Sequence, residues 1–394
     1  MTIVPLLLLT LGAINWGYAY PLFLFVALLR QRMLGREIYF NFLYAPGFWL
    51  LLSAGMTYAL IGMRTISGVY HHGVLPVVAF AIGWLIAEGS SDKQIRDGIL
   101  ALAAGFGTYA TLNMLVNIGN NRYRLIDFWT GTYRAATGSG ALNTLPIAVA
   151  PYAVKFEKRL LVKTMFLVLF FATIQYMFML GTRTQFAILL LIVILAALQF
   201  AYSEQGIAGV LKCIGIMAVI SLIAFLLYHF NVFSIRYYIL STNLAARYER
   251  RASLENSDSF RFQSFWIGLR ELIQYPMGGR ASQIYRHNMW LDVGRVSGII
   301  PFCLLLVYSI KNFANVTAIW KNTKILPSLR YLLLFLYIGA YVNRFVEPIW
   351  EGALNFFLAL CVVDGMVSAM MRRLKNDPIP EESVSDTSNL HTDL

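Results

Sequence analysis

The chain has 394 residues, of which 58% are hydrophobic and only 13% are charged. A soluble globular domain carries about a quarter charged residues, so this composition excludes an ordinary soluble protein. A net charge of +12 would suggest nucleic acid in a soluble protein, but insertion into a membrane and contact with anionic lipid account for much of it here. We therefore expect no nucleic-acid partner.

Apolar runs long enough to cross about 30 Å of hydrocarbon recur along the whole chain. Because these runs are continuous rather than alternating, they predict an all-α transmembrane bundle of about eleven or twelve spans and not a β-barrel. In chain order, the predicted spans lie near residues 3–28, 40–63, 71–88, 97–118, 141–154, 160–180, 183–203, 211–233, 289–310, 327–345 and 350–371.

Four segments follow from this pattern. Residues 1–233 are predicted to form an N-terminal bundle of about eight spans, and its first span shows no cleavage site and is expected to be retained. Residues 234–288 form a long external loop that carries the predicted site. Residues 289–371 form the C-terminal transmembrane helices, and the polar residues 372–394 are predicted to be a disordered cytoplasmic tail.

Basic residues fall in alternate connections, and this alternation predicts the orientation. The nine lysines belong to one set of connections, which we expect to be cytoplasmic: Lys93, Lys155, Lys158, Lys163, Lys212, Lys311, Lys321, Lys324 and Lys375. The loop of residues 234–288 then lies outside, and its basic residues are all arginines. The positive-inside rule opposes arginine there, so we expect a function for this charge.

Arginine's planar guanidinium suits bidentate contacts with phosphate, which indicates an anionic, phosphorylated ligand. The alternative is that these arginines pair with nearby acids and with lipid headgroups. Arg183 is the sharpest candidate, because it stands between Thr182 and Thr184 at the outer start of a strongly apolar helix. An uncompensated charge there would cost several kcal/mol, although the side chain could instead reach the membrane interface.

His287 lies at the outer mouth of the predicted ninth span, and imidazole is the usual general base near neutral pH. An isolated histidine at an interface can also be merely solvated. Four carboxylates could orient the imidazole, and the sequence does not rank them: Asp127, Glu249, Asp292 and Glu347.

A longer pattern surrounds this histidine. Ser259-Phe260-Arg261 opens an amphipathic segment, Tyr275-Pro276-Met277-Gly278-Gly279 follows, and His287-Asn288 precedes Gly298, which lies eleven residues after the histidine. This spacing resembles the signature of the O-antigen ligase and polymerase superfamily, the WaaL and Wzy proteins. The resemblance covers roughly residues 170–310, because Thr182-Arg183 looks like the family's upstream arginine.

The resemblance implies a GT-C-like membrane glycosyltransferase of the bacterial inner membrane with its site facing the periplasm. Such an enzyme passes a glycan from undecaprenyl diphosphate to an acceptor sugar with inversion, and without a metal or other cofactor. It implies that Arg183 and Arg261 bind the diphosphate and that His287 is the catalytic base. Residues expected to support these groups are Arg280, Arg286, Asn288, Asp292, Arg344 and Glu347.

Within the superfamily, the short segment from Gly279 to His287 and the proline at Pro301 favour a polymerase of O-antigen or capsular repeat units. A ligase that transfers the glycan to lipid A-core is the alternative. A flippase for an anionic lipid-linked glycan is a third candidate, but it would need charge at mid-depth, where the predicted spans have few ionisable groups. The implied partners are the lipid-linked donor, a glycan or lipid A-core acceptor and membrane lipids, with a chain-length regulator and a flippase in addition.

Overall fold

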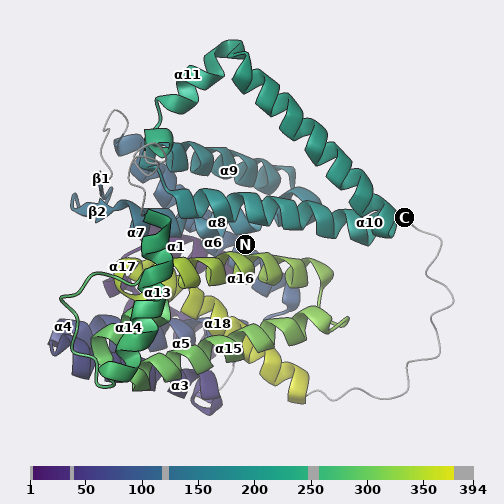
Figure 1. Ribbon diagram of the computed structural model, residues 1–394. Helices are drawn as coiled ribbons and strands as arrows, with labels where there is room; N and C mark the ends of the chain where they lie inside the picture. The colour runs from purple at the N-terminus through teal and green to yellow at the C-terminus, as the bar shows by residue number, and fades with distance from the viewer. Residues whose placement is uncertain (1–2, 36–39, 118–123, 247–256, 377–394) are drawn as a thin grey trace.

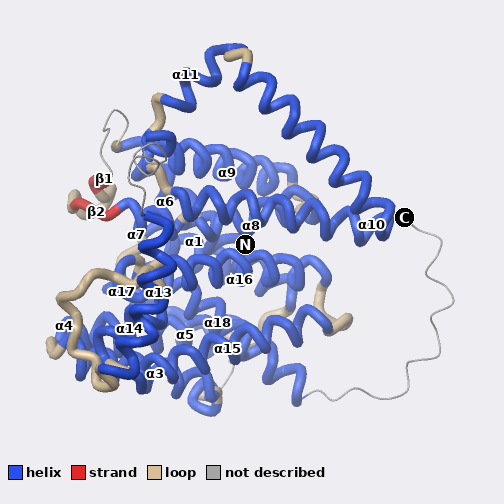
Figure 2. The backbone as a smooth tube through the Cα atoms, viewed as in Figure 1, coloured by secondary structure: helices blue, strands red, loops and turns tan. Residues whose placement is uncertain are grey.

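The computed structural model describes residues 3–35, 40–117, 124–246 and 257–376, and most of these residues are helical (Figures 1 and 2). The strands in this part of the chain are β1 (Arg124–Ile126) and β2 (Tyr133–Ala135), which pair antiparallel at one end of the bundle. The prediction of an all-α fold is confirmed.

The first half of the described chain holds α1 (Ile3–Ile14), η1 (Gly17–Ala19), α2 (Tyr20–Met33), η2 (Asn41–Tyr44), α3 (Pro46–Thr57), η3 (Tyr58–Met63), α4 (Ile66–Gly68), η4 (Val69–Val74), α5 (Leu75–Ala87), α6 (Asp92–Val116), α7 (Ala136–Leu142), α8 (Thr144–Phe156) and α9 (Leu160–Leu180). The second half holds α10 (Arg183–His229), η5 (Val232–Ser234), α11 (Ile235–Leu240), α13 (Ser257–Gln274), α14 (Met289–Ser297), α15 (Ile299–Lys321), α16 (Pro327–Val346), α17 (Ile349–Gly352) and α18 (Leu354–Asn376).

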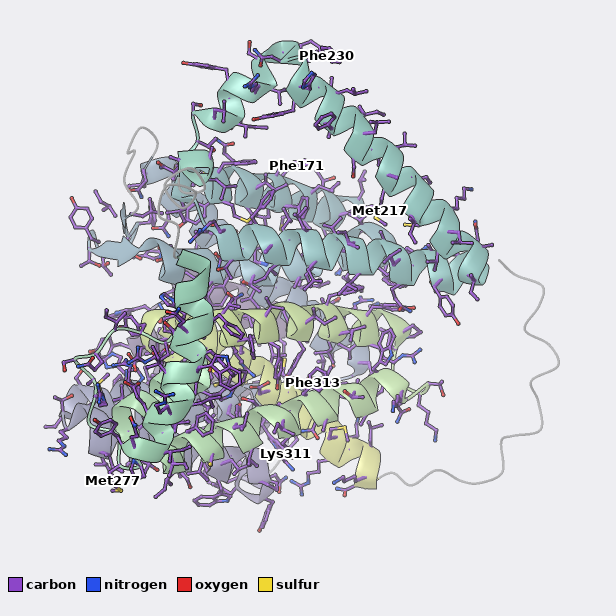
Figure 3. The ribbon with its side chains drawn as sticks, in the orientation of Figure 1. Phe171, Met217, Phe230, Met277, Lys311 and Phe313 are labelled. Atoms are coloured by element: carbon purple, nitrogen blue, oxygen red, sulfur yellow. The ribbon has the colours of Figure 1, made fainter. Side chains whose placement is uncertain are left out.

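Eight helical segments of the described chain are long and apolar enough to cross a membrane. They are Pro46–Met63, Ile66–Ala87, Asp92–Val116, Leu160–Leu180, Arg183–His229, Ile299–Lys321, Pro327–Val346 and Leu354–Asn376. Large apolar side chains cover the exterior, and Phe171, Phe230 and Phe313 point outward in Figure 3, each about half or more exposed. These are the helices and the surface of a multi-pass membrane protein.

The eight segments are fewer than the eleven or twelve spans predicted, and part of the difference lies at breaks in the backbone. The predicted first span is split into α1 and α2, because Asn15 between them has a left-handed φ of 47°. The predicted span at 289–310 is also split, since Gly298, with a φ of 90°, separates α14 from α15. The prediction of one continuous helix is therefore wrong in both places.

Helix α10 has 47 residues, but it contains two of the predicted spans. Gly206 inside it has non-helical φ and ψ of 62° and −144°, and the chain reverses there, so that the arms 183–205 and 207–229 form a sharp V in Figure 1. The predicted turn between the seventh and eighth spans is confirmed. At the other end of the chain, α18 continues to Asn376, so residues 372–376 of the predicted tail are helical, and residues 377–394 lie outside the described chain.

Charged connections gather at one end of the bundle, which we call the lysine end. Arg30 and Arg373 both donate hydrogen bonds to Ser90, over 3.1 Å to its Oγ and 2.9 Å to its carbonyl, respectively. Lys155 pairs with Glu204 beside the kink of α10. Eight of the nine lysines of the sequence lie on or near the connections at this end, and Lys311 lies in the middle of α15.

The opposite end, at the left of Figure 1, holds β1, β2, α13, α14 and α17. Polar side chains join its connections across the sequence. Asn355 donates to the carbonyl of Asn15 over 2.8 Å, and the Trp129 indole donates to the carbonyl of Ala13 over 2.9 Å. The predicted site residues His287 and Glu347 lie at this end.

Helices α5 and α18 pack closely through small residues. A Cβ atom built on Gly365 would lie 2.0 Å from the carbonyl oxygen of Phe80, and one built on Gly83 would lie 1.8 Å from that of Val362. Both glycines therefore let two backbones approach within a distance that no side chain permits, which is how apolar helices associate inside a membrane.

We expect Gly365→Ala to lower the free energy of unfolding by about 1–3 kcal/mol, because the added methyl group forces α5 and α18 apart. The measurement is unfolding of the purified protein in detergent. Gly215→Ala is the matched control, since a Cβ there meets nothing within 4 Å. That control should be as stable as the parent or slightly more stable, and equal stability of the two variants would contradict the close packing.

Candidate functional site

His287 sits on a bent segment just before α14. Its φ is 54°, in the left-handed region that a non-glycine residue rarely adopts. The Asp292 carboxylate accepts the backbone N–H of Arg286 over 2.7 Å and that of Asn288 over 3.2 Å, one on each side of the histidine. Asp292 therefore holds the bend and does not orient the imidazole.

Asn288 fixes this segment to two helices. Its Oδ1 accepts the N–H of Leu291 over 3.1 Å and so caps the start of α14. Its Nδ2 donates to the carbonyl of Phe345 over 3.1 Å, at the end of α16. Asn288 thus places His287 beside the residues that follow α16.

Glu347 is the carboxylate that meets the histidine. Its Oε2 lies 3.8 Å from His287 Nδ1, an ion-pair distance but longer than a hydrogen bond. Its Oε1 accepts the hydroxyl of Thr184 over 2.6 Å. The Glu347 side chain is 6% exposed whereas that of His287 is 30% exposed, so a buried carboxylate stands behind a solvent-accessible imidazole.

Two of the other three carboxylates considered from the sequence contact other groups. Asp127 accepts the Tyr109 hydroxyl and, over 3.0 Å, the N–H of Trp129. Asp292 binds backbone, as described above, and Glu249 lies outside the described residues.

Arg183 precedes Thr184, the residue that hydrogen-bonds to Glu347. Arg183 is the first residue of α10 and is half-buried. The start of α10, the end of α16 and the segment before α14 therefore converge on Glu347. Arg261 is the fifth residue of α13, and its side chain lies outside the described residues, so its predicted contact with a diphosphate stays a prediction.

Arg280 and Arg286 share one carboxylate. Arg286 is 8% exposed and donates two hydrogen bonds to Glu271, over 2.9 and 2.7 Å. Arg280 Nη2 lies 3.5 Å from the same carboxylate, and its guanidinium stacks 4.4 Å from the centre of the Tyr275 ring. These arginines tie the segment that carries His287 to α13.

Two glycines of the sequence pattern let the segments on either side of His287 cross. Gly278 and Gly298 have φ of 72° and 90°, and a Cβ on Gly298 would lie 2.1 Å from the carbonyl oxygen of Pro276. That carbonyl instead accepts the N–H of Ile299 over 2.8 Å. The spacing of the pattern thus corresponds to a closed loop of backbone that begins and ends at these glycines.

Sequence reasoning missed Arg295 and Glu351. Arg295 is 3% exposed, and its Nη1 donates to the carbonyls of Arg280, Ala281 and Gln283 over 2.7, 2.9 and 3.0 Å. Its Nη2 lies 3.0 Å from Glu351 Oε2. Both residues fall inside predicted spans, where any charge is costly, and that signal could have identified them.

Arg344, two residues before the end of α16, is buried between helices. It is 1% exposed, and its Nη2 lies 3.5 Å from Asp364 Oδ2 between α16 and α18. Asp364 also accepts the hydroxyls of Tyr308, over 2.7 Å, and Tyr337. Arg344 is therefore held inside the helix bundle by an acid of α18, and its predicted supporting role stays a prediction.

Burial raises the pKa of the Glu351 carboxyl from 4.5 to about 7, even though Arg295 lowers it. Because the folded pKa exceeds the unfolded one, this group favours the folded state below about pH 4.5, and that contribution is lost as the pH rises through 7. We expect the melting temperature of the wild type, relative to that of Glu351→Gln, to fall between pH 5 and pH 8. Parallel pH profiles of the two proteins would contradict the raised pKa.

Within the described residues, no three histidine, cysteine, aspartate or glutamate side chains come together in a way that could hold a metal ion. No protein-family model matches the chain, and no curated protein matches it. The geometry is that of an accessible imidazole backed by a buried carboxylate, next to an arginine at the start of an apolar helix.

Proposed function

We propose that this chain is a multi-pass glycosyltransferase of the O-antigen polymerase and ligase type, GT-C-like in architecture. The donor is a glycan on undecaprenyl diphosphate, and the acceptor is a sugar hydroxyl. The observation that carries this proposal is the arrangement of His287, Glu347 and Thr184 beside Arg183. It supplies a base and a phosphate-binding cation at the end of the bundle opposite the lysines.

In the proposed reaction, His287 accepts the proton of the acceptor hydroxyl as that oxygen bonds to the anomeric carbon. The bond from this carbon to the phosphate oxygen breaks, and the lipid diphosphate leaves with the electron pair, so the configuration inverts. Arg183, together with Arg261, stabilises the negative charge on the diphosphate. Glu347 stabilises the imidazolium that forms, because its carboxylate is held by Thr184 at an ion-pair distance from the ring.

The proposed orientation puts this end of the bundle in the periplasm and the lysine end in the cytoplasm of a bacterium, since lysines mark the cytoplasmic side. An alkaline phosphatase fusion at Asn256 should then be active, and a fusion after Asn376 should be inactive. The reverse pattern would place the site on the wrong side for a lipid-linked periplasmic donor and would contradict the proposal.

The short segment from Gly279 to His287 and the proline at Pro301 favour a polymerase of repeat units over a ligase. The rival of another class is a flippase, and the buried pair of Arg344 and Asp364 is the observation that favours it, because transport requires charge inside the bundle. This pair is neutralised internally, whereas the imidazole is accessible.

The test is the surface glycan of a deletion strain. If the deleted gene encodes a polymerase, the strain keeps a single repeat unit on lipid A-core. If it encodes a ligase, the strain accumulates lipid-linked polymer and has no glycan on lipid A-core. Lipid-linked repeat units trapped on the cytoplasmic side would identify a flippase and overturn the proposed chemistry. An unchanged glycan, with wild-type expression of the gene in the parent strain, would exclude all three.

A further inference from the structure

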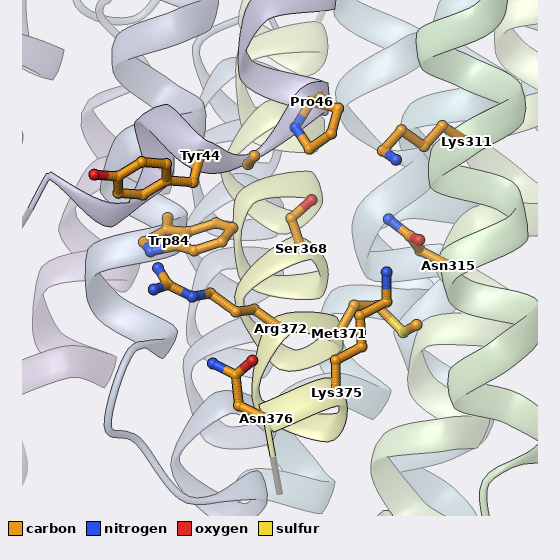
Figure 4. A pocket seen from close by; sticks show the side chains of 12 residues that line it. Tyr44, Pro46, Trp84, Lys311, Asn315, Ser368, Met371, Arg372, Lys375 and Asn376 are labelled. Carbon is orange, nitrogen blue, oxygen red and sulfur yellow. The ribbon is translucent and has the colours of Figure 1, made fainter. Parts of the chain in front are cut away.

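A cavity of about 240 Å³ opens at the lysine end, far from His287 (Figure 4). It lies between the start of α3, the end of α5, the middle of α15 and the last turns of α18. The side chains that define its chemistry are those of Tyr44, Trp84, Lys311, Arg372 and Lys375. Asn315, Ser368 and Asn376 add neutral hydrogen-bonding groups to the wall.

Three cations converge on this cavity from two helices. Lys311 comes from α15, and Arg372 and Lys375 come from α18. None of the described residues that line the cavity is an acid. Three positive side chains around one space repel one another, so an anion bound between them would stabilise the arrangement.

Other basic residues of the same end behave differently. Arg159 contacts the carboxylates of Glu157 and Asp97, at 2.7 and 3.2 Å, and Arg373 pairs with Asp92. The positive-inside rule explains why basic residues are at this end, but it does not explain why three of them surround one cavity without an acid.

Arg372 is held in position by aromatic rings. Its guanidinium lies 6.0 Å from the centre of the Tyr44 ring and 5.9 Å from that of Trp84, and its Nη1 lies 3.5 Å from the carbonyl oxygen of Asn41. Such contacts restrain the charge without neutralising it. The guanidinium therefore stays available to an anion in the cavity.

The rim of the cavity is apolar and aromatic. Tyr44 is 80% exposed, and Leu43, Trp49 and Ile310 on the adjoining helices are also exposed. Tyrosine and tryptophan gather where a protein crosses the membrane interface, which places the mouth of the cavity at the headgroup level. A volume of about 240 Å³ suits a headgroup whose acyl chains remain in the bilayer, since pockets for whole drug-sized ligands are usually larger.

We propose that this cavity binds the phosphate group of an anionic phospholipid from the leaflet at the lysine end. Lys311, Arg372 and Lys375 contact the phosphate, and the neutral side chains contact the rest of the headgroup. Basic pockets between membrane helices bind lipid headgroups by this chemistry. The site is independent of the reaction proposed for His287.

The test uses the full-length protein in detergent and measures its thermal stabilisation on titration with phosphatidylglycerol or phosphatidylcholine. The cavity variant carries Lys311→Gln, Arg372→Gln and Lys375→Gln. The control variant loses the same charge from exposed lysines of the same end that do not line the cavity, through Lys158→Gln, Lys321→Gln and Lys324→Gln.

Wild type and control should show saturable stabilisation by phosphatidylglycerol and little by phosphatidylcholine. The cavity variant should bind phosphatidylglycerol between tenfold and about a hundredfold more weakly. Equal binding by all three proteins, or an equal loss in both variants, would overturn the site in favour of diffuse surface charge. Lys311→Gln alone, with a smaller loss in the same direction, tests the site if the triple variant does not fold.

Soluble glycerol phosphate separates the two sources of the phosphate group. A lipid site predicts that it competes only at concentrations far above those of the phospholipid, because it lacks the acyl chains. Competition at equal concentration would overturn a lipid ligand.

Discussion

His287→Ala is expected to lower glycan transfer per folded molecule by about 10² to 10⁴, the usual contribution of a positioned general base. The residue's partners explain why folding should survive the change. Its imidazole is 30% exposed and meets Glu347 only at 3.8 Å, whereas the bend around it is held by Asp292 through backbone hydrogen bonds that alanine keeps. The purified variant should also still bind undecaprenyl diphosphate, since the arginines remain.

The measurement is transfer of glycan from the lipid-linked donor, divided by the amount of folded protein. His71→Ala is the matched control, because His71 of η4 lies at the same end and its imidazole hydrogen-bonds to Ser67 of the adjoining α4. Glu347→Gln should also lower activity, because a neutral amide cannot stabilise the imidazolium that forms when His287 accepts the proton. Activity of His287→Ala within about tenfold of wild type would remove the histidine from the mechanism.

Arg183→Lys is expected to lose most activity although the protein inserts and folds. Lysine preserves the charge but not the planar fork that binds two phosphate oxygens at once. The substitution changes only the side chain at the start of α10, so the contact of the next residue, Thr184, with Glu347 should remain. The loss should therefore concern the donor, and the affinity for undecaprenyl diphosphate should fall together with the rate.

Arg236→Lys provides the control, since Arg236 is an exposed arginine of α11. It should keep near-normal activity. If Arg183→Lys did the same, charge alone would suffice at this position, and pairing with lipid headgroups would be the better interpretation of Arg183.

The helical framework followed from the sequence because hydrophobic runs and the positions of lysine are properties of single segments. The turn inside α10 follows from the predicted spans 183–203 and 211–233, with Lys212 beside it, and the structure confirms it. The breaks at Asn15 and Gly298 were missed because each lies inside a segment predicted as one span, and only backbone conformation reveals them.

The site was predictable in part. His287 and Arg183 could be selected from their position at the ends of apolar runs, but the partner of the histidine could not. Glu347 stands sixty residues after His287 in the chain, and only the packing of α16 against the segment before α14 brings them together. The same applies to Arg344, which Asp364 of a different helix holds in the interior.

The left-handed backbone of His287 has a consequence for how this sequence can change. Glycine or asparagine would occupy a φ of 54° with less strain, by roughly 1 kcal/mol or more for glycine. A histidine is thus kept at a position where the backbone prefers other residues. Replacement by glycine should make the protein more resistant to heat, and the proposed activity should be lost in the same variant, so screens for thermostability alone would select against this residue.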